Sequence, residues 1–207
     1  MELNQKGILL VLSGPSGSGK GTIVSQIVAE HPDFALSVSL TTRAPRPHEI
    51  DGVHYSFVDR DEFTKQIEAG NMLEYTEYCD NLYGTHQNQV NKMLDKGVNV
   101  ILEIEIEGAL NIKKLRPDAV LIMILPPSYE VLENRLRSRG TNTEEDIQKR
   151  LATAKKELEY LSDYHYCVIN ETGKSDIAAK EVCEIIATER HKLTRNKDIL
   201  DNFYAKQ

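Results

Sequence analysis

The residues with the clearest chemical potential lie at positions 13–22, SGPSGSGKGT, where spaced glycines are combined with a lysine. From Gly14 to Lys20 they fit the pattern G-x-x-x-x-G-K-[ST], except that Gly21 stands where a magnesium-binding hydroxyl is expected. Small residues let successive backbone N–H groups point at phosphate oxygens, and the lysine adds positive charge. Because an apolar run precedes this stretch and a helical pattern follows it, we predict a phosphate-binding loop.

Gly21 changes the expected metal coordination more than the phosphate binding. Without a hydroxyl at this position Mg²⁺ loses one protein ligand, which it tolerates because it keeps several waters and binds substrate phosphates directly. Thr22, one position later, is then free to contact an inner phosphate at the start of the helix. The pattern favours nucleotide kinases that phosphorylate small acceptors over the common GTP-dependent switch proteins.

Two arginines further along the chain lie on a stiff turn. Arg43 and Arg46 flank Pro45, which fixes its own φ and restricts the residue before it. Guanidinium groups bind phosphate through paired, charge-assisted hydrogen bonds, although many surface arginines are simply solvated. Tyr55 and Tyr83 belong to the same segment, and the combined set favours a second phosphate site over a solvated surface.

Short apolar runs predict the strands that must position these groups. They occupy residues 7–13, 98–104, 119–125 and 166–170, and helical patterns lie between them, the first at 20–30. Strands that alternate with helices predict an α/β fold, in which a parallel sheet is flanked by helices on both faces.

Two segments interrupt this alternation. Residues 37–85 are rich in tyrosine, threonine and turn residues around a helical pattern at 61–69, which predicts a small mixed α/β insertion. Residues 135–150 are rich in arginine, and Thr143-x-x-Asp146 is a capping box. We expect this second segment to form a lid, with two helices joined by a short arginine-lined loop.

The composition excludes several classes of protein. The longest apolar run is too short to span a bilayer, and a net charge of −7 argues against broad binding of nucleic acid. The three cysteines, Cys79, Cys167 and Cys183, lack metal-like spacing, so we expect small buried side chains in a reducing compartment. We therefore expect a cytoplasmic protein that binds neither nucleic acid nor membrane.

The motifs recur in an order that is typical of one family. After the phosphate loop come S-x-S-x-T-T-R-x-P-R-x-x-E-x-x-G-x-x-Y, E-Y…Y-G-T, L-E-I-E-x-x-G-A, and R-L-x-x-R-G-T…R. From about residue 7 to 170, their order and spacing resemble the guanylate kinase family, P-loop nucleoside monophosphate kinases that transfer a phosphoryl group from ATP to GMP. The resemblance implies GMP and ATP as substrates, with Mg²⁺ accompanying ATP.

The resemblance also implies a GMP site. The residues that match the guanine-binding positions are Ser39, Glu74 and Thr85, with Glu105 as a further candidate. The residues that match the positions holding the GMP phosphate are Arg43, Arg46, Tyr55 and Tyr83.

The ATP site and the catalytic groups are implied in the same way. The loop residues that would hold the ATP phosphates are Gly14, Pro15, Ser16, Gly17, Ser18, Gly19, Lys20, Gly21 and Thr22. Asn170 lies near where the family holds the adenine. The catalytic residues would be Lys20, Arg43 and the lid arginines Arg135, Arg139 and Arg150.

The chain departs from the family at a strand end. Many relatives carry two aspartates where this chain has Glu103 and Glu105. Glu103 is the candidate for a water-mediated contact with Mg²⁺, and its extra methylene leaves that role open.

Because the attacking phosphate oxygen is already an anion, transfer requires alignment and charge neutralisation rather than a strong base.

We expect a single guanylate-kinase-like domain over residues 1–207. Its predicted parts are a core at 1–36, 86–134 and 151–194, a GMP-binding subdomain at 37–85, a lid at 135–150 and a polar tail at 195–207. Two alternatives remain, a non-catalytic guanylate-kinase-like interaction module and a kinase for another nucleoside monophosphate. The sequence leaves the choice between monomer and homo-oligomer undecided.

Overall fold

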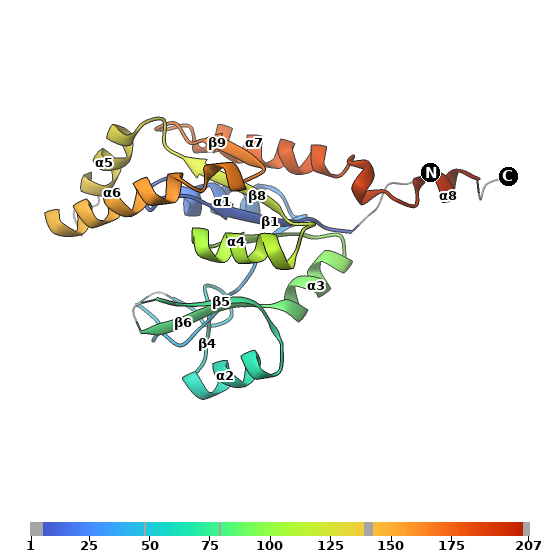
Figure 1. The fold of residues 1–207 in the computed structure, drawn as a ribbon, viewed down its shortest axis with the longest axis horizontal. Coiled ribbons are helices and arrows are strands. Elements are labelled where there is room, and N and C mark those ends of the chain that lie inside the picture. Colours follow the sequence, from blue (N-terminus) through green and yellow to red (C-terminus); the bar gives the residue numbers. More distant parts are fainter. Residues whose placement is uncertain (1–5, 48, 79, 139–142, 205–207) are drawn as a thin grey trace.

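The computed structural model describes residues 6–47, 49–78, 80–138 and 143–204. Within these residues, five parallel strands form a central sheet in the order β2-β7-β1-β8-β9 (Figure 1). The strands are β1 (Leu9–Ser13), β2 (Phe34–Leu36), β7 (Asn99–Glu103), β8 (Val120–Leu125) and β9 (Tyr166–Ile169). Four of them correspond to the predicted apolar runs. Strand β2 was not predicted, because three residues are too few to establish a pattern.

Helices cover both faces of this sheet, as the alternation of elements predicted. Alternate side chains of β1 point to opposite faces, so that Leu10 packs with Ile23 and Val182 on one face while Leu9 packs with Val90 and Ile112 on the other. The helices on the first face are α1 (Lys20–Glu30) and α7 (Ser175–Glu189). Those on the second face are α3 (Gln87–Asp95) and α4 (Ile106–Leu115). The α/β fold class is confirmed.

A second, mixed sheet forms what we call the small subdomain, and it lies beyond α4 from the central sheet (Figure 1). Its elements are β3 (Leu40–Thr41), β4 (Ser56–Phe57), α2 (Arg60–Glu68), β5 (Met72–Tyr78) and β6 (Asn81–His86). The Asp59 carboxylate caps α2 by accepting the Glu62 N–H at 2.7 Å, and Phe63 is completely buried against Leu40 and Leu82. The subdomain therefore has an apolar core of its own.

The lid helices are α5 (Tyr129–Ser138) and α6 (Glu144–Leu158). The Ser128 hydroxyl accepts the Val131 N–H at 3.2 Å, and the predicted capping box of Thr143 and Asp146 is present. The helices pack on each other through Leu132, Leu136, Ile147, Leu151 and Ala154. They carry the described part of the segment 135–150, which the sequence predicts to form a lid.

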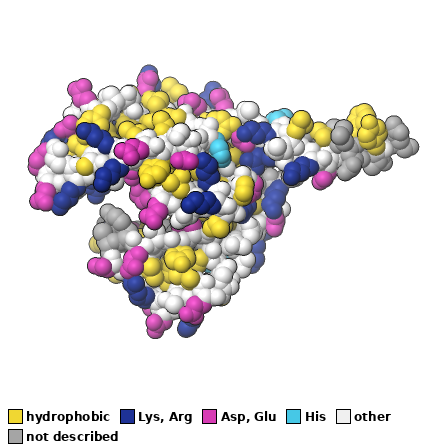
Figure 2. All heavy atoms as spheres, in the orientation of Figure 1, with side chains coloured by type: hydrophobic (Ala, Val, Ile, Leu, Met, Phe, Trp, Pro, Cys, Tyr) yellow, Lys and Arg dark blue, Asp and Glu magenta, His cyan; other side chains and the backbone are white. Residues whose placement is uncertain are grey.

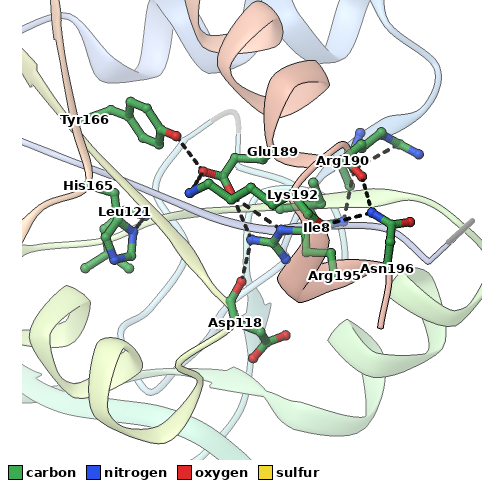
Figure 3. Close-up of polar contacts among 11 residues, drawn as sticks. Ile8, Asp118, Leu121, His165, Tyr166, Glu189, Arg190, Lys192, Arg195 and Asn196 are labelled. Carbon is green, nitrogen blue, oxygen red and sulfur yellow. Dashed lines mark hydrogen bonds and ion pairs between the residues drawn. The ribbon is translucent and has the colours of Figure 1, made fainter. Parts of the chain in front are cut away.

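A buried carboxylate holds the end of α7 (Figure 3). Glu189 is 2% exposed and accepts hydrogen bonds from Tyr166, Lys192 and Arg195. Arg195 also donates to the Asp118 carbonyl at 2.8 Å. The remaining elements are the 3₁₀ turns η1 (Leu161–Asp163) and η2 (Leu193–Arg195) and the helix α8 (Ile199–Tyr204), which extends away from the core (Figure 1).

The cysteines differ from the prediction. Cys167 is exposed and Cys183 is partly exposed, and the two form no disulfide within the described part of the chain; Cys79 lies outside it. The prediction that all were buried was wrong for Cys167, since β9 is the edge strand and this residue lies on its outer face. No helix among the described residues is long and apolar enough to cross a membrane.

Candidate active site

A cavity of about 480 Å³ lies between the carboxyl ends of the central strands and the small subdomain. In the space-filling view the surface is hollowed between the lid helices and the small subdomain (Figure 2). Predicted site residues that line the cavity are Lys20, Ser39, Tyr55, Glu74, Tyr83, Glu103 and Glu105. Its volume lies in the range of sites for small ligands, and open α/β sheets bind ligands at this edge.

Glu74 is a buried acid in the wall of this cavity, with 7% of its surface exposed. It lies opposite Thr85 in the register of β5 and β6, and the Thr85 hydroxyl donates to its Oε1 at 2.8 Å. Burial raises the pKa of the Glu74 carboxyl, and the bond from Thr85 opposes that rise. A β-carbon on Gly108 would lie only 3.4 Å from Oε2, so a small residue in α4 leaves room for the carboxylate.

Arg43 lies beside two tyrosines of the cavity wall. Its guanidinium carbon is 5.5 Å from the centre of the Tyr55 ring, which packs edge-on against Tyr83 at 6.0 Å. The Arg43 side chain also donates to Glu49, whose carboxylate raises the pKa of the guanidinium. Arg46 is exposed and, among the described residues, is not one that lines the cavity.

The phosphate loop follows β1 and leads directly into α1. Gly19 has φ +93°, and a β-carbon there would lie 2.2 Å from the Asn170 amide nitrogen, so only glycine fits. Gly19 is the N-cap residue of α1 and has no side chain that could cap it, which leaves N–H groups at the positive end of the helix available for an anion. The Lys20 ammonium donates to the Gly14 carbonyl and, at 3.4 Å, to that of Pro15.

The lid helices reach this loop through two predicted arginines. Arg135 donates to the carbonyls of Ser18 and Asn170, at 3.2 and 2.8 Å. Arg150 donates to the Ser16 hydroxyl at 2.6 Å. Arg139 lies outside the described residues. Both described arginines therefore contact residues of the predicted phosphate loop.

The family model described as guanylate kinase matches residues 6–189. The chain belongs to the guanylate kinase family. It is 47% identical to the guanylate kinase of Clostridioides difficile (strain 630) over 95% of each chain, and 47% identical to that of Desulfitobacterium hafniense (strain Y51) over 94% of this chain and 96% of the relative. The crystal structure of guanylate kinase from Anaplasma phagocytophilum superposes with a TM-score of 0.77 at 30% identity, covering 97% of this chain and 95% of that one.

Glu103 lies beside Gly21, the glycine that replaces the usual hydroxyl residue of the loop. A β-carbon on Gly21 would lie 3.6 Å from Glu103 Oε1, within ordinary contact distance. Burial raises the pKa of the Glu103 carboxyl, and the charge of Lys20 opposes that rise. A carboxylate at this point is a hard oxygen donor of the kind that Mg²⁺ prefers.

Asn170 contacts the phosphate loop directly. It is 4% exposed, and its amide nitrogen donates to the Ser18 carbonyl at 2.8 Å. The same carbonyl accepts from Arg135, so strand β9, the loop and the lid meet at one oxygen. This contact braces the loop, a role that the sequence did not predict.

Further residues of the cavity wall were missed by sequence reasoning. They are Leu36, Ser37, His54, Thr76, Glu77, Gly84, Ile104, Glu107 and Gly108. Gly108 had a signal, since it belongs to the quoted motif L-E-I-E-x-x-G-A, but its contact with Glu74 joins two elements that no local pattern relates.

Proposed function

We propose that this chain transfers the γ-phosphoryl group of ATP to GMP, giving ADP and GDP, with the two nucleotides bound at opposite ends of the described cavity. The main support is that one cavity is lined both by Lys20 of the phosphate loop and by Glu74, Tyr55 and Tyr83 of the small subdomain. A donor phosphate and an acceptor nucleotide can therefore meet within one cleft.

The acceptor base would be read by Glu74, together with Ser39, Thr85 and Glu105. Guanine presents a ring N–H and an exocyclic amino group on one edge, and a carboxylate can accept hydrogen bonds from both. Thr85 holds one oxygen of Glu74, which fixes the plane of the acid. Adenine presents a ring nitrogen lone pair at the corresponding position, so it would leave the buried carboxylate opposed by an acceptor.

The acceptor phosphate would be bound by Arg43, Arg46, Tyr55 and Tyr83. Support for this role comes from the position of Arg43 against Tyr55 and from the packing of the two tyrosines. A guanidinium and two phenol hydroxyls supply donors that match a phosphate monoester.

The donor would be ATP, with its phosphates on residues 14–22 and its adenine near Asn170. We infer that Mg²⁺ accompanies it, held mainly by phosphate oxygens, and that Glu103 would contact it through water, because this carboxylate lies beside the phosphate loop and is a hard oxygen donor. When bound, the ion would neutralise charge on the phosphates.

The reaction would then depend on alignment and on charge. A phosphate oxygen of GMP attacks the γ-phosphorus in line, its bond to phosphorus forms as the bond to the β-phosphate bridging oxygen breaks, and ADP leaves. Lys20, Arg43, Arg135, Arg139 and Arg150 would stabilise the negative charge that gathers on the transferring group. The attacking oxygen is already ionised, so no side chain is required to remove a proton.

We further propose a cytoplasmic location and no nucleic-acid partner. The first is supported by the free thiols of Cys167 and Cys183, and the second by the net charge of −7.

The test is a coupled assay of ADP release from ATP with GMP, dGMP, AMP and UMP as acceptors. We expect strong preference for GMP over AMP. Equal turnover of AMP would indicate a kinase for another nucleoside monophosphate, and no ADP release with any acceptor would indicate a non-catalytic interaction module.

A further inference from the structure

We propose that Glu49 is a positioning residue for the acceptor phosphate, because it fixes both the guanidinium of Arg43 and the backbone turn that carries Arg46. The inference rests on the proposed function, since it takes Arg43 to be a ligand of the GMP phosphate. Glu49 itself would not touch the substrate.

Both carboxylate oxygens of Glu49 are used within this turn. Oε1 accepts from Arg43 Nη2 at 2.9 Å, and Oε2 accepts from the backbone N–H of Arg46 at 2.7 Å. The backbone N–H of Glu49 donates in return to the Arg46 carbonyl at 3.0 Å. These three hydrogen bonds join Glu49 to both Arg43 and Arg46, and we call this arrangement the clasp.

The clasp holds Arg43 in one orientation. The other terminal nitrogen, Nη1, donates to the Ala44 carbonyl at 2.7 Å, and the guanidinium lies 5.5 Å from the ring centre of Tyr55. The side chains of Arg43 and Glu49 are each only 16% exposed, in a turn whose residues Ala44 and Arg46 are exposed. An arginine held at both ends of its fork loses little rotational freedom when a ligand binds.

One nitrogen of the held guanidinium has no acceptor among the described residues. Arg43 Nε is buried and has no hydrogen-bond partner among the residues that the structure describes. Because a buried N–H without a partner is unfavourable, it points to an acceptor that arrives with the substrate. A phosphate oxygen is such an acceptor, so the clasp orients Arg43 with this donor ready.

Glu49 is a brace rather than a competitor of the phosphate. If the phosphate displaced Glu49 from Arg43, it would also disturb the bond from Oε2 to the Arg46 N–H and with it the turn. Ion pairing lowers the pKa of the Glu49 carboxyl, so its negative charge stays in place at neutral pH. Removing the brace therefore weakens binding of the phosphate, whereas removing a competitor would strengthen it.

The variant that tests this is Glu49→Gln. Glutamine keeps the length of the side chain but offers one acceptor and one amide N–H₂, so it cannot accept from both Arg43 and the Arg46 N–H. Glu62→Gln is the matched control, because Glu62 is a partly exposed glutamate on α2 of the same subdomain and accepts from Gln66.

Binding of GMP and of guanosine, both measured by calorimetry, separates the phosphate contribution from that of the base. For Glu49→Gln we expect the Kd of GMP to rise roughly tenfold, the cost of ordering a long side chain. Guanosine binding and the KM for ATP should stay within about twofold of the parent. Glu62→Gln should leave every one of these quantities unchanged.

Three results would overturn the proposal. Unchanged GMP affinity would show that Arg43 needs no brace, and tighter GMP binding would identify Glu49 as a competitor. An equal loss for GMP and guanosine would indicate damage to the whole subdomain, which thermal melting would reveal independently. If the parent protein fails to turn over GMP, the proposed function fails. In that case, NMR order parameters of Arg43 Nε–H in the parent and in Glu49→Gln still report whether the clasp orders this side chain.

Discussion

The hydroxyl of Thr85 donates a hydrogen bond of 2.8 Å to the Glu74 carboxylate, across the antiparallel pair of β5 and β6. This bond stabilises a charge in a place where burial opposes it, since Glu74 is 7% exposed and burial raises its pKa. A buried carboxylate with one held oxygen is an unfavourable element of a fold unless a ligand uses it. A neutral residue in place of Glu74 should therefore lower the activity and raise the stability of the protein.

The variant Glu74→Gln should show these two opposite effects, on activity and on stability. The amide oxygen can still accept from Thr85, but its N–H₂ group would oppose the donors of guanine, so kcat/KM for GMP should fall about 100-fold or more. The melting temperature should rise by about 2–4 °C, because no charge remains to be desolvated. The coupled assay and thermal melting measure the two effects, and an active variant would remove Glu74 from the guanine site.

The pH dependence of GMP binding follows from the same acid. Because burial raises the pKa of Glu74 above its usual value of 4.5, GMP affinity should decline with acidification before an ordinary glutamate begins to titrate. Between the unfolded and the raised folded pKa the native state binds more protons, so the contribution of Glu74 to the free energy of unfolding falls as pH rises. Calorimetry from pH 8 to pH 5 should show GMP affinity falling with acidification in the parent. The dependence of GMP affinity on pH should be weaker in Glu74→Gln.

Two glycines of the phosphate loop should respond oppositely to alanine. Gly19→Ala places a β-carbon 2.2 Å from the Asn170 amide at φ +93°, so we expect kcat to fall about 100-fold and stability to fall by about 1–3 kcal/mol. Gly21 lies in α1, where its β-carbon would only touch Glu103 at 3.6 Å. Gly21→Ala should keep activity within about threefold and stabilise the helix by roughly 0.5–1 kcal/mol. Steady-state kinetics and urea unfolding test both, and a strong defect in Gly21→Ala would contradict this view of the loop.

Arg135→Lys should reveal whether the fork or the charge of the lid arginine matters. Lysine keeps the charge but cannot span the carbonyls of Ser18 and Asn170, so kcat should fall about 10- to 100-fold with the KM for GMP unchanged. Arg137→Lys is the control, because Arg137 pairs with the half-buried Glu133 and the exposed Glu144 on the lid helices themselves. Equal effects in the two variants would indicate a general loss of lid stability.

Glu189→Ala should destabilise the fold without changing the reaction. The carboxylate is buried among Tyr166, Lys192 and Arg195, so its removal should lower the free energy of unfolding by about 3 kcal/mol. Burial favours a higher pKa for Glu189, but its hydrogen bonds outweigh burial and lower it, so this stabilisation is present above pH 4.5 and is lost as pH falls through the lower folded value. The residue lies at the far end of α7, about 21 Å from its start, so the KM values of the folded protein should not change.

Much of the fold could be predicted from short stretches of the sequence. The loop at residues 13–22, the flanking strand and helix, the capping box at Thr143 and the alternation of strands and helices all depend on neighbours within a few residues. Strand β2 was missed because its three residues carry no period of their own, and the exposure of Cys167 was missed because strand order decides which strand is the edge. The predicted boundaries of the lid and of the subdomain remain predictions.

Some features of the candidate site could likewise be predicted from the sequence, and others could not. The sequence by itself determined which residue types were present and in what order, and that was enough to predict the phosphate loop and to identify the family. Only the tertiary structure decided that Glu74 is buried between Thr85 and Gly108, that Asn170 braces the loop, and that Glu49 holds Arg43. Backbone conformation and periodicity are set by adjacent residues, whereas burial, pKa and the choice of hydrogen-bond partner depend on which distant segments pack together.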